Sequence, residues 1–326
     1  MEPPLPIHRA TPTREAGRTG SAMRRRTARE GPDRLVRVGP NAFVRAVEWD
    51  AAGPRTRYVT RVHARLARLG EPATASHLSA AALLGLPSLR GWPEEVHVTV
   101  PRSRYRSRTT GLVLHTRPLH PSEAVRSGNV LVTTVPRTVV DVALTADVRA
   151  AVVLTDSALR NGTTLPDLRR ALDAHPAARG RRVAELVLDL ADGRSGSAAE
   201  SFARVVFREL GLPEPVLQQE FVVDGRRIVV DFWFPEQGVV VEVDGRATYT
   251  QVRYLAGRSP TEVFLDEKRR QEALLTVPDV RRVVRTEWRD LHEPASLAHR
   301  LRAAGLPCAV RPGPSAILAT AGASAA

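Results

Sequence analysis

Three acidic residues interrupt a stretch that otherwise reads as buried β-strand. Glu242 and Asp244 lie within a valine-rich run, and Asp231 lies in the apolar run one short turn earlier. That turn predicts that Phe234 pairs with Val239. The same antiparallel register then sets Asp231 opposite Glu242. Because side chains alternate along a strand, Asp244 shares a face with Glu242. The sequence therefore predicts three carboxylates on one face of a sheet.

Such a cluster needs compensating positive charge. Burying a carboxylate costs several kcal/mol or forces its protonation. One compensation is a hard divalent cation, Mg²⁺ or Mn²⁺, because carboxylate oxygens are its natural ligands. The other is a buried network of ion pairs with arginine. The cation is favoured, because no arginine alternates with the acids on these two strands.

The single lysine of the chain, Lys268, lies in a predicted helix that follows these strands. At 100° per residue it shares a face with Phe264 and Leu275, while Arg269 and Arg270 point elsewhere. If the apolar residues face the sheet, Lys268 can reach the acids. The alternative is a lysine at the helix edge that extends into solvent.

The elements that position these residues follow the order α-β-β-β-α-β, which predicts a mixed sheet flanked by helices. The first helix begins at Ser197, with Glu200 three residues on, a capping-box pattern. A capping role and a ligand role for Glu200 are compatible. The Asp224-Gly225 pair predicts a hairpin turn between the first two strands.

The front half predicts a mixed α+β region, so the fold class of the chain is α/β. The pattern indicates a hairpin at 34–46, helices at 56–70 and 76–86, two strands within 96–119 and a mostly helical segment at 138–162.

Charge separates the two halves. The formal charge is +13, from 48 basic and 35 acidic residues, and the excess lies mainly in 1–193. A basic half predicts a polyanionic partner, here DNA, although a general preference for arginine gives the same excess without a partner. The alternative for the arginine-rich segments is a charged surface exposed to solvent. The candidate residues for phosphate contacts are Arg24, Arg25, Arg26, Arg102, Arg104 and Arg106.

Several classes of protein are excluded. A single cysteine, Cys308, rules out an internal disulfide and a cysteine-based zinc site, and it favours a cytoplasmic protein. The nine histidines show no paired ligand spacing, so no histidine metal site is predicted. No apolar run of about 18 residues indicates a membrane span. Phosphate-binding loops and serine nucleophile elbows are missing from the sequence.

Residues 195–292 resemble a known family. The segments "SAAESFARVVFRELGLPEPVLQQ", "VDFWFP", "VEVDG" and "EKRRQEALL…VRRVVRTEW" are similar to the very-short-patch-repair-type branch of the PD-(D/E)XK nucleases. The resemblance implies a restriction-endonuclease-like core that hydrolyses phosphodiesters with Mg²⁺ or Mn²⁺. It implies Asp231 and Glu242 as metal ligands, Asp244 as a third acid, Glu200 as an accessory, and Lys268 at a basic helix position. Asp244 and Thr248 stand where relatives often have lysine.

Residues 34–160 resemble AbiEi-type antitoxin and transcriptional-regulator proteins. The segments that carry this likeness are "RLVRVGPNAFV", "TASHLSAAALLGLPS", "VHVTVPR" and "TTVPRTVVDVA". The resemblance implies a winged-helix module followed by an α/β domain. In that family the helix-turn-helix precedes the hairpin, whereas 1–33 is rich in arginine and poor in apolar residues.

Two functions follow. The first is a metal-dependent DNA endonuclease with a basic DNA-binding front half; the second is a non-catalytic regulator of the toxin–antitoxin type that uses the nuclease fold as a scaffold. The endonuclease requires that Asp231, Glu242 and Lys268 converge on one point, whereas the regulator does not. The expected division is a disordered basic arm (1–33), a winged-helix-like remnant (34–100), an AbiEi-like domain (101–193), a nuclease-like domain (194–310) and a disordered tail (311–326).

Overall fold

A computed structural model describes residues 3–9, 34–69, 72–101, 108–244 and 260–309. The chain forms two compact units. The first comprises Met1–Asp147 and Thr163–Ala184, and the second comprises Val148–Gly162 and Glu185–Ala326. The five-part division expected from the sequence stays a prediction.

A three-stranded sheet begins the first unit, in the order β1-β3-β2, from β1 (His8–Arg9), β2 (Leu35–Gly39) and β3 (Ala42–Arg45). The predicted hairpin at 34–46 is confirmed as the β2–β3 pair. The expectation of a disordered arm is wrong for β1, which pairs with β3. Leu5 and Ile7 explain this, because they pack against the apolar cluster of that sheet. Residues 10–33 lie outside the described residues.

A six-stranded sheet follows, in the order β6-β7-β5-β4-β9-β8. Its strands β5 and β7 are parallel neighbours, with Thr99 beside His115. The strands are β4 (Thr74–Ala75), β5 (Val96–Val100), β6 (Arg108–Thr109), β7 (Leu112–Thr116), β8 (Ala124–Ser127) and β9 (Val130–Thr133). The unit also contains α2 (Ala46–Ala51), α3 (Pro54–Leu69), α4 (His77–Leu84), α5 (Val135–Ala143), α7 (Leu165–Ala174) and the 3₁₀ turn η1 (Pro121–Glu123). The helices expected at 56–70 and 76–86 are therefore confirmed as α3 and α4.

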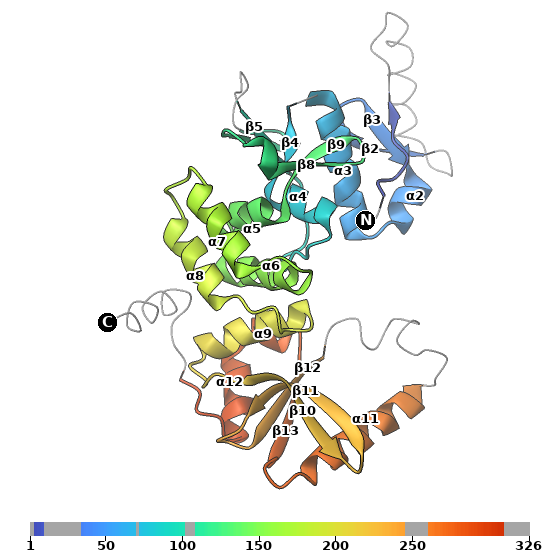
Figure 1. Ribbon diagram of the computed structural model, residues 1–326. Coiled ribbons are helices and arrows are strands. Elements are labelled where there is room, and N and C mark those ends of the chain that lie inside the picture. Colours follow the sequence, from blue (N-terminus) through green and yellow to red (C-terminus); the bar gives the residue numbers. More distant parts are fainter. Residues whose placement is uncertain (1–2, 10–33, 70–71, 102–107, 245–259, 310–326) are drawn as a thin grey trace, which may run out of the picture. The chain divides into compact units, whose positions relative to one another are not determined.

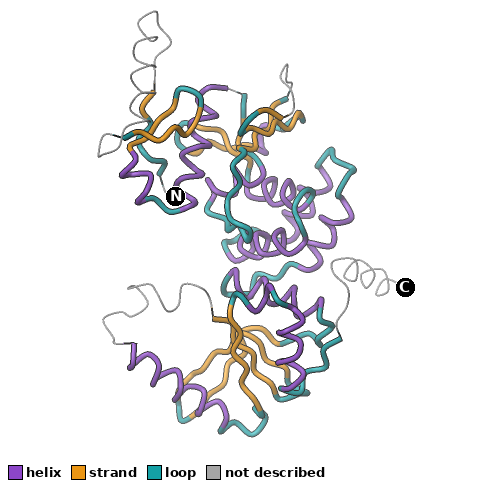
Figure 2. Tube along the Cα trace, turned by 180° about the vertical axis from the view of Figure 1, so that it is seen from behind, coloured by secondary structure: helices purple, strands orange, loops and turns teal. Residues whose placement is uncertain are grey.

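The second unit contains a four-stranded sheet in the order β10-β11-β12-β13, antiparallel except for the parallel β12–β13 pair. Helices run along both sides of this sheet (Figure 1, Figure 2). The elements of the second unit are α6 (Val148–Arg160), α9 (Ala198–Glu209), β10 (Val216–Val223), β11 (Arg226–Phe234), β12 (Val239–Asp244), α11 (Pro260–Leu275), β13 (Arg282–Glu287), η2 (Asp290–His292) and α12 (Pro294–Ala303). The boundary between the two units falls within α8 (Arg181–Leu190). The order from α9 to β13 is the expected α-β-β-β-α-β, and the chain is a mixed α/β protein. Among the described helices, none has the length and apolar character needed to span a membrane.

Different helices pack against the two faces of this sheet. Phe207 of α9 contacts Phe232 and Phe234, with ring centroids 5.0 and 6.2 Å apart. Leu274 of α11 packs in a cluster with Trp233 and Val240. Because side chains alternate along a strand, Glu242 shares the face of Val240. Glu242 therefore lies on the side of the sheet that α11 covers, and Arg270 of that helix contacts it.

Two turns fix the register of these strands. Asp224 and Gly225 both have positive φ, 47° and 73°, as a type I′ hairpin turn requires. Gly238 closes the β11–β12 turn with φ of 66°. A Cβ at Gly238 would lie 2.7 Å from the carbonyl oxygen of Asp279, so only glycine fits there.

Candidate acidic site

The predicted pairing of Phe234 with Val239 is confirmed, and the β11–β12 ladder runs from there to the pair of Phe232 with Val241. The expected pairing of Asp231 with Glu242 lies one step beyond this ladder and stays a prediction. Asp231 is the next residue of β11. Its Oδ2 accepts a hydrogen bond of 2.8 Å from the backbone N–H of Val243. This bond holds the carboxylate against β12, beside Glu242.

Asp231 is an unusual carboxyl group. The pKa of Asp231 is raised to about 7, mainly by burial and also by the neighbouring carboxylates of Glu200 and Glu242, against the lowering effects of the Val243 hydrogen bond and the Arg270 charge. Within the described residues, no arginine or lysine lies within ion-pair distance of Asp231 or Glu200. Two acids from different elements therefore lie near each other without a cationic partner of their own.

Glu200 reaches this place from the first turn of α9. The Ser197 hydroxyl accepts the Glu200 N–H at 3.1 Å, as an N-cap does. The Glu200 carboxylate accepts from the N–H of Gly196 at 2.7 Å and from the Gln218 side chain at 2.8 Å. Of the two hydrogen bonds that define a capping box, the one to the Ser197 hydroxyl is present, while the Glu200 carboxylate accepts from Gly196 instead of the N-cap residue. Gln218 lies on β10 between Leu217 and Gln219, which pair with Phe232 and Val230 of β11, and it has a positive φ of 52°.

Glu242 is only 7% exposed, and it is compensated by arginine. Arg270 of α11 approaches its Oε1 to 2.6 Å, and Arg285 approaches its Oε2 to 3.7 Å. Burial raises the pKa of Glu242, while both guanidinium groups lower it. Arg285 stands beside Glu242 in the parallel β12–β13 register. Both arginines lie outside the two acid-bearing strands, on α11 and β13, and the ion-pair alternative therefore holds for Glu242.

The expectation that Lys268 rather than Arg270 faces the sheet is wrong. The Lys268 side chain is 63% exposed, and its Nζ lies 3.8 Å from Glu272 on the same helix. The reason is the buried face of α11. Leu274 is fully buried, whereas Leu275 is 45% exposed. Arg270 precedes Leu274 by four residues and therefore shares its face. The buried leucine of the pair is Leu274 and not Leu275, which was expected to face the sheet.

Asp244 ends β12, next to Glu287 of β13 in register. Burial raises its pKa; Arg285 lowers it, and the carboxylates of Glu267 and Glu287 raise it. Arg285 also binds Glu267 at 2.8 Å. Asp244 therefore belongs to the outer, arginine-linked part of the acidic site. The remaining candidate residues lie outside the described residues: Arg24, Arg25, Arg26, Arg102, Arg104, Arg106 and Thr248.

The site thus has two parts with different chemistry. Glu200 and Asp231 are neighbouring carboxylates that raise each other's cost of ionisation and are candidates to hold a cation, while Glu242 and Asp244 are influenced by nearby arginines. The carboxylate oxygens of Glu200 and Asp231 are the candidate ligands for a metal ion. Among the described residues, the three side chains whose ligand atoms all lie within 4.8 Å of one another are histidines instead: His77, His97 and His115.

Sequence reasoning missed this histidine group. The rule it applied looks for ligands a few positions apart, and these three are about twenty residues apart. They come together because β5 and β7 are parallel neighbours, and strand neighbours cannot be read from spacing. The alternating pattern around His97 and His115 was a signal that both lie on strands, whereas His77 lies at the start of a helix.

Fold and site together define a mixed α/β protein with a largely buried carboxylate cluster between a sheet and a helix. The chain is 32% identical over 203 residues to the uncharacterized protein Rv2248 of Mycobacterium tuberculosis, and equally to the uncharacterized protein MT2308 of another strain. The aligned part covers 62% of this chain and 70% of each relative. The chain belongs to the family of these mycobacterial proteins. No protein-family model and no solved structure matches it.

Proposed function

We propose that this chain is a metal-dependent DNA endonuclease whose second unit is a restriction-endonuclease-like core of the PD-(D/E)XK type. One observation carries the proposal. Glu200 and Asp231 are mostly buried carboxylates from different elements, and within the described residues neither has an ion-pair partner. Uncompensated buried charge of this kind is costly, and a divalent cation removes the cost.

The protein groups have distinct roles in this proposal. Asp231 and Glu200 hold Mg²⁺ or Mn²⁺, and each is oriented by a backbone N–H, from Val243 and Gly196. When bound, the cation neutralises charge on a phosphodiester and lowers the pKa of a bound water. Arg270 supplies the positive charge that the sequence assigned to Lys268. It is held between Glu242 and the Val229 carbonyl oxygen, which is 2.5 Å from its Nη2.

The second candidate function is a non-catalytic DNA-binding regulator of the AbiEi antitoxin type. The 2.6 Å ion pair between Arg270 and Glu242 favours it. Glu242 is a metal ligand by the nuclease resemblance, and an arginine beside it supplies positive charge without a metal, as suits a nuclease fold kept as a scaffold. The basic first half would bind DNA in both cases.

Cleavage of supercoiled and mismatched DNA with Mg²⁺ or Mn²⁺ separates the two functions. Asp231→Asn and Glu200→Gln should abolish nicking, since each removes a ligand charge. Glu272→Gln and Lys268→Ala are the matched controls and should keep it, because both side chains are 63% exposed and pair with each other. DNA binding is measured on the same proteins by fluorescence anisotropy.

Each other result has a definite meaning. Tight DNA binding without cleavage in either metal refutes the nuclease and supports the regulator. Nicking that survives Asp231→Asn shows that another site or a contaminant cleaves. If neither binding nor cleavage is found, both functions are refuted.

A further inference from the structure

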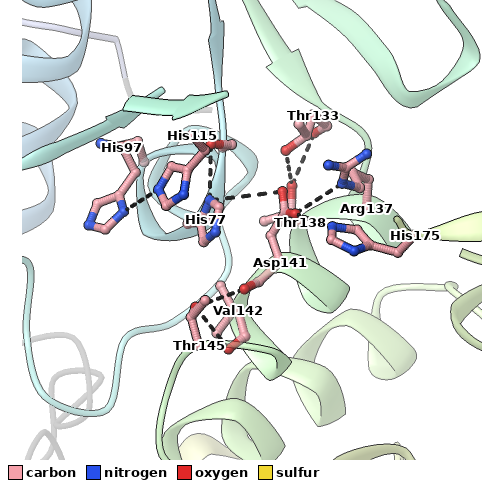
Figure 3. A network of polar contacts seen from close by, with 12 residues as sticks. His77, His97, His115, Thr133, Arg137, Thr138, Asp141, Val142, Thr145 and His175 are labelled. Atoms are coloured by element: carbon pink, nitrogen blue, oxygen red, sulfur yellow. Dashed lines mark hydrogen bonds and ion pairs between the residues drawn. The ribbon is translucent and has the colours of Figure 1, made fainter. Parts of the chain in front are cut away.

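Three imidazoles converge in the first unit, far in sequence from the acidic site. His77 is the first residue of α4, His97 lies on β5, and His115 lies on β7. His97 precedes Thr99 by two residues, and Thr99 is the parallel-strand neighbour of His115. Both histidines therefore project from the same face of the sheet. Figure 3 shows the three rings gathered side by side.

The rings are close enough to share one ion. A nitrogen from each lies within 4.8 Å of the other two. The Nδ1 of His97 and the Nε2 of His115 are 3.1 Å apart, and the rings of His77 and His115 stack with centroids 3.7 Å apart. His77 also has a left-handed φ of 52°, a strained backbone for a residue with a Cβ. Such strain persists where surrounding structure holds a residue in place.

A buried carboxylate stands behind this group. Asp141 of α5 is 1% exposed, and its Oδ1 accepts from Arg137 at 3.0 Å and contacts His175 at 3.1 Å. Its Oδ2 has no hydrogen-bond partner and lies 4.0 Å from the Nδ1 of His77 (Figure 3). The Nδ1 of His77 also lies 3.0 Å from the Ser76 hydroxyl.

This arrangement matches the surroundings of metal-binding histidines. A ligating imidazole usually directs its second nitrogen to a carboxylate or hydroxyl, which fixes the tautomer and ring orientation. Asp141 and Ser76 are so placed for His77. A polar core would explain one histidine with a partner, but it gives no reason for three rings to meet at one point beside an unsatisfied buried carboxylate oxygen.

We propose that His77, His97 and His115 bind one divalent transition-metal ion, with Zn²⁺ as the ion that an all-imidazole set fits best. Imidazole is a borderline ligand suited to Zn²⁺ and poorly suited to Mg²⁺. The site is thus chemically distinct from the acidic site. Three protein ligands leave a fourth position for water or an external ligand, the arrangement typical of reactive rather than purely structural zinc. Asp141 is a positioning residue in this site.

The test uses the full, untagged chain, stripped of metal with a chelator and dialysed. Zn²⁺ is titrated by calorimetry, and bound metal is counted by mass spectrometry of the desalted protein. Co²⁺ is the spectroscopic probe, because tetrahedral coordination gives strong visible absorption. We expect one ion per chain and a rise in melting temperature on binding.

Variants identify the ligands. His97→Gln and His115→Gln should each weaken Zn²⁺ binding by about 100-fold or more. Asp141→Asn should weaken it by about 10- to 100-fold, the usual effect of removing a carboxylate that orients a metal-binding histidine. His299→Gln, an exposed histidine on α12, is the control and should bind as the wild type does. Circular dichroism of the metal-free proteins checks folding. His115 is only half-buried, so its variant is the one to use if the others unfold.

Two results would overturn the proposal. One is a folded wild type that binds no Zn²⁺ at a protein concentration of about 100 µM, well above the micromolar dissociation constants expected of a specific site. The other is unchanged affinity in the His97→Gln, His115→Gln double variant, which would assign the metal to other histidines. Neither result depends on nuclease activity, so this inference and the proposed function can fail separately.

Discussion

Replacing Asp231 with asparagine should remove a pH-dependent loss of stability from the metal-free protein. The pKa of Asp231 is about 7 in the folded chain, against 3.8 for an ordinary aspartate. The folded state therefore holds this proton more tightly than the unfolded state. The free energy of unfolding falls as pH rises between these two values, and the loss is complete above the higher one.

The magnitude follows from the two pKa values. The difference between 3.8 and about 7 corresponds to about 4 kcal/mol, at 1.36 kcal/mol per pKa unit. Relaxation around a partly exposed carboxylate lowers this, so we expect about 2–4 kcal/mol. An asparagine oxygen can still accept the Val243 N–H, now 2.8 Å from Asp231. Asp231→Asn therefore removes the charge and keeps the shape.

The assay is urea unfolding in a chelator, followed by tryptophan fluorescence, at about pH 4.5 and about pH 8. Asp231→Asn should gain about 2–4 kcal/mol over the wild type on going from the lower to the higher pH. Titrating groups that do not interact with Asp231 act alike in both proteins and cancel in the difference. Asp279→Asn, an exposed acid, is the control and should leave the pH dependence unchanged.

Parallel stability curves for the wild type and Asp231→Asn would refute the reasoning, because the proton would then be held no more tightly in the folded state. Mg²⁺ provides a second arm at about pH 8. A cation held by Asp231 and Glu200 stabilises the wild type in proportion to its binding, and leaves Asp231→Asn nearly unaffected.

Three further predictions concern stability alone, and urea unfolding measures each. Gly238→Ala should lower the free energy of unfolding more than Gly225→Ala does, because both glycines have positive φ but only at Gly238 would a Cβ meet backbone atoms. We expect a loss of roughly 1 kcal/mol at Gly225 and at least twice that at Gly238. Equal losses would contradict the close contact. Arg204→Met leaves the fully buried Asp156 without the 2.8 Å ion pair and should cost about 3–5 kcal/mol, largely recovered in a double variant with Asp156→Leu. Phe207→Ala should cost about 3–5 kcal/mol, since its ring is 1% exposed; a loss below about 1 kcal/mol would contradict its place in the core.

The parts of the site that were predictable are those governed by neighbours in sequence. The pairing of Phe234 with Val239 followed from the four-residue turn that ends at Gly238, and it is confirmed. The Ser197 cap and the Asp224-Gly225 turn followed from local chemistry in the same way. A turn type and a cap depend on a few adjacent backbone angles, which the residue types set directly.

The partners of the acids could not be predicted, because they depend on which helix face is buried. The sequence offered Leu274 and Leu275 as adjacent candidates, and the choice between them decides whether Arg270 or Lys268 reaches the sheet. A rotation of about 100° separates the two answers. Only the packing of α11 against Trp233 and Val240 selects one of them.

The sequence by itself determined the local elements, the α-β-β-β-α-β order and the Phe234–Val239 register, because these depend on short-range pattern. The tertiary structure alone decided what the acidic residues meet. It gave Glu242 two arginines, left Glu200 and Asp231 without a cationic partner among the described residues, and brought three distant histidines together. Charge compensation and metal coordination depend on distances of a few ångströms between segments far apart in the chain, and only packing sets such distances.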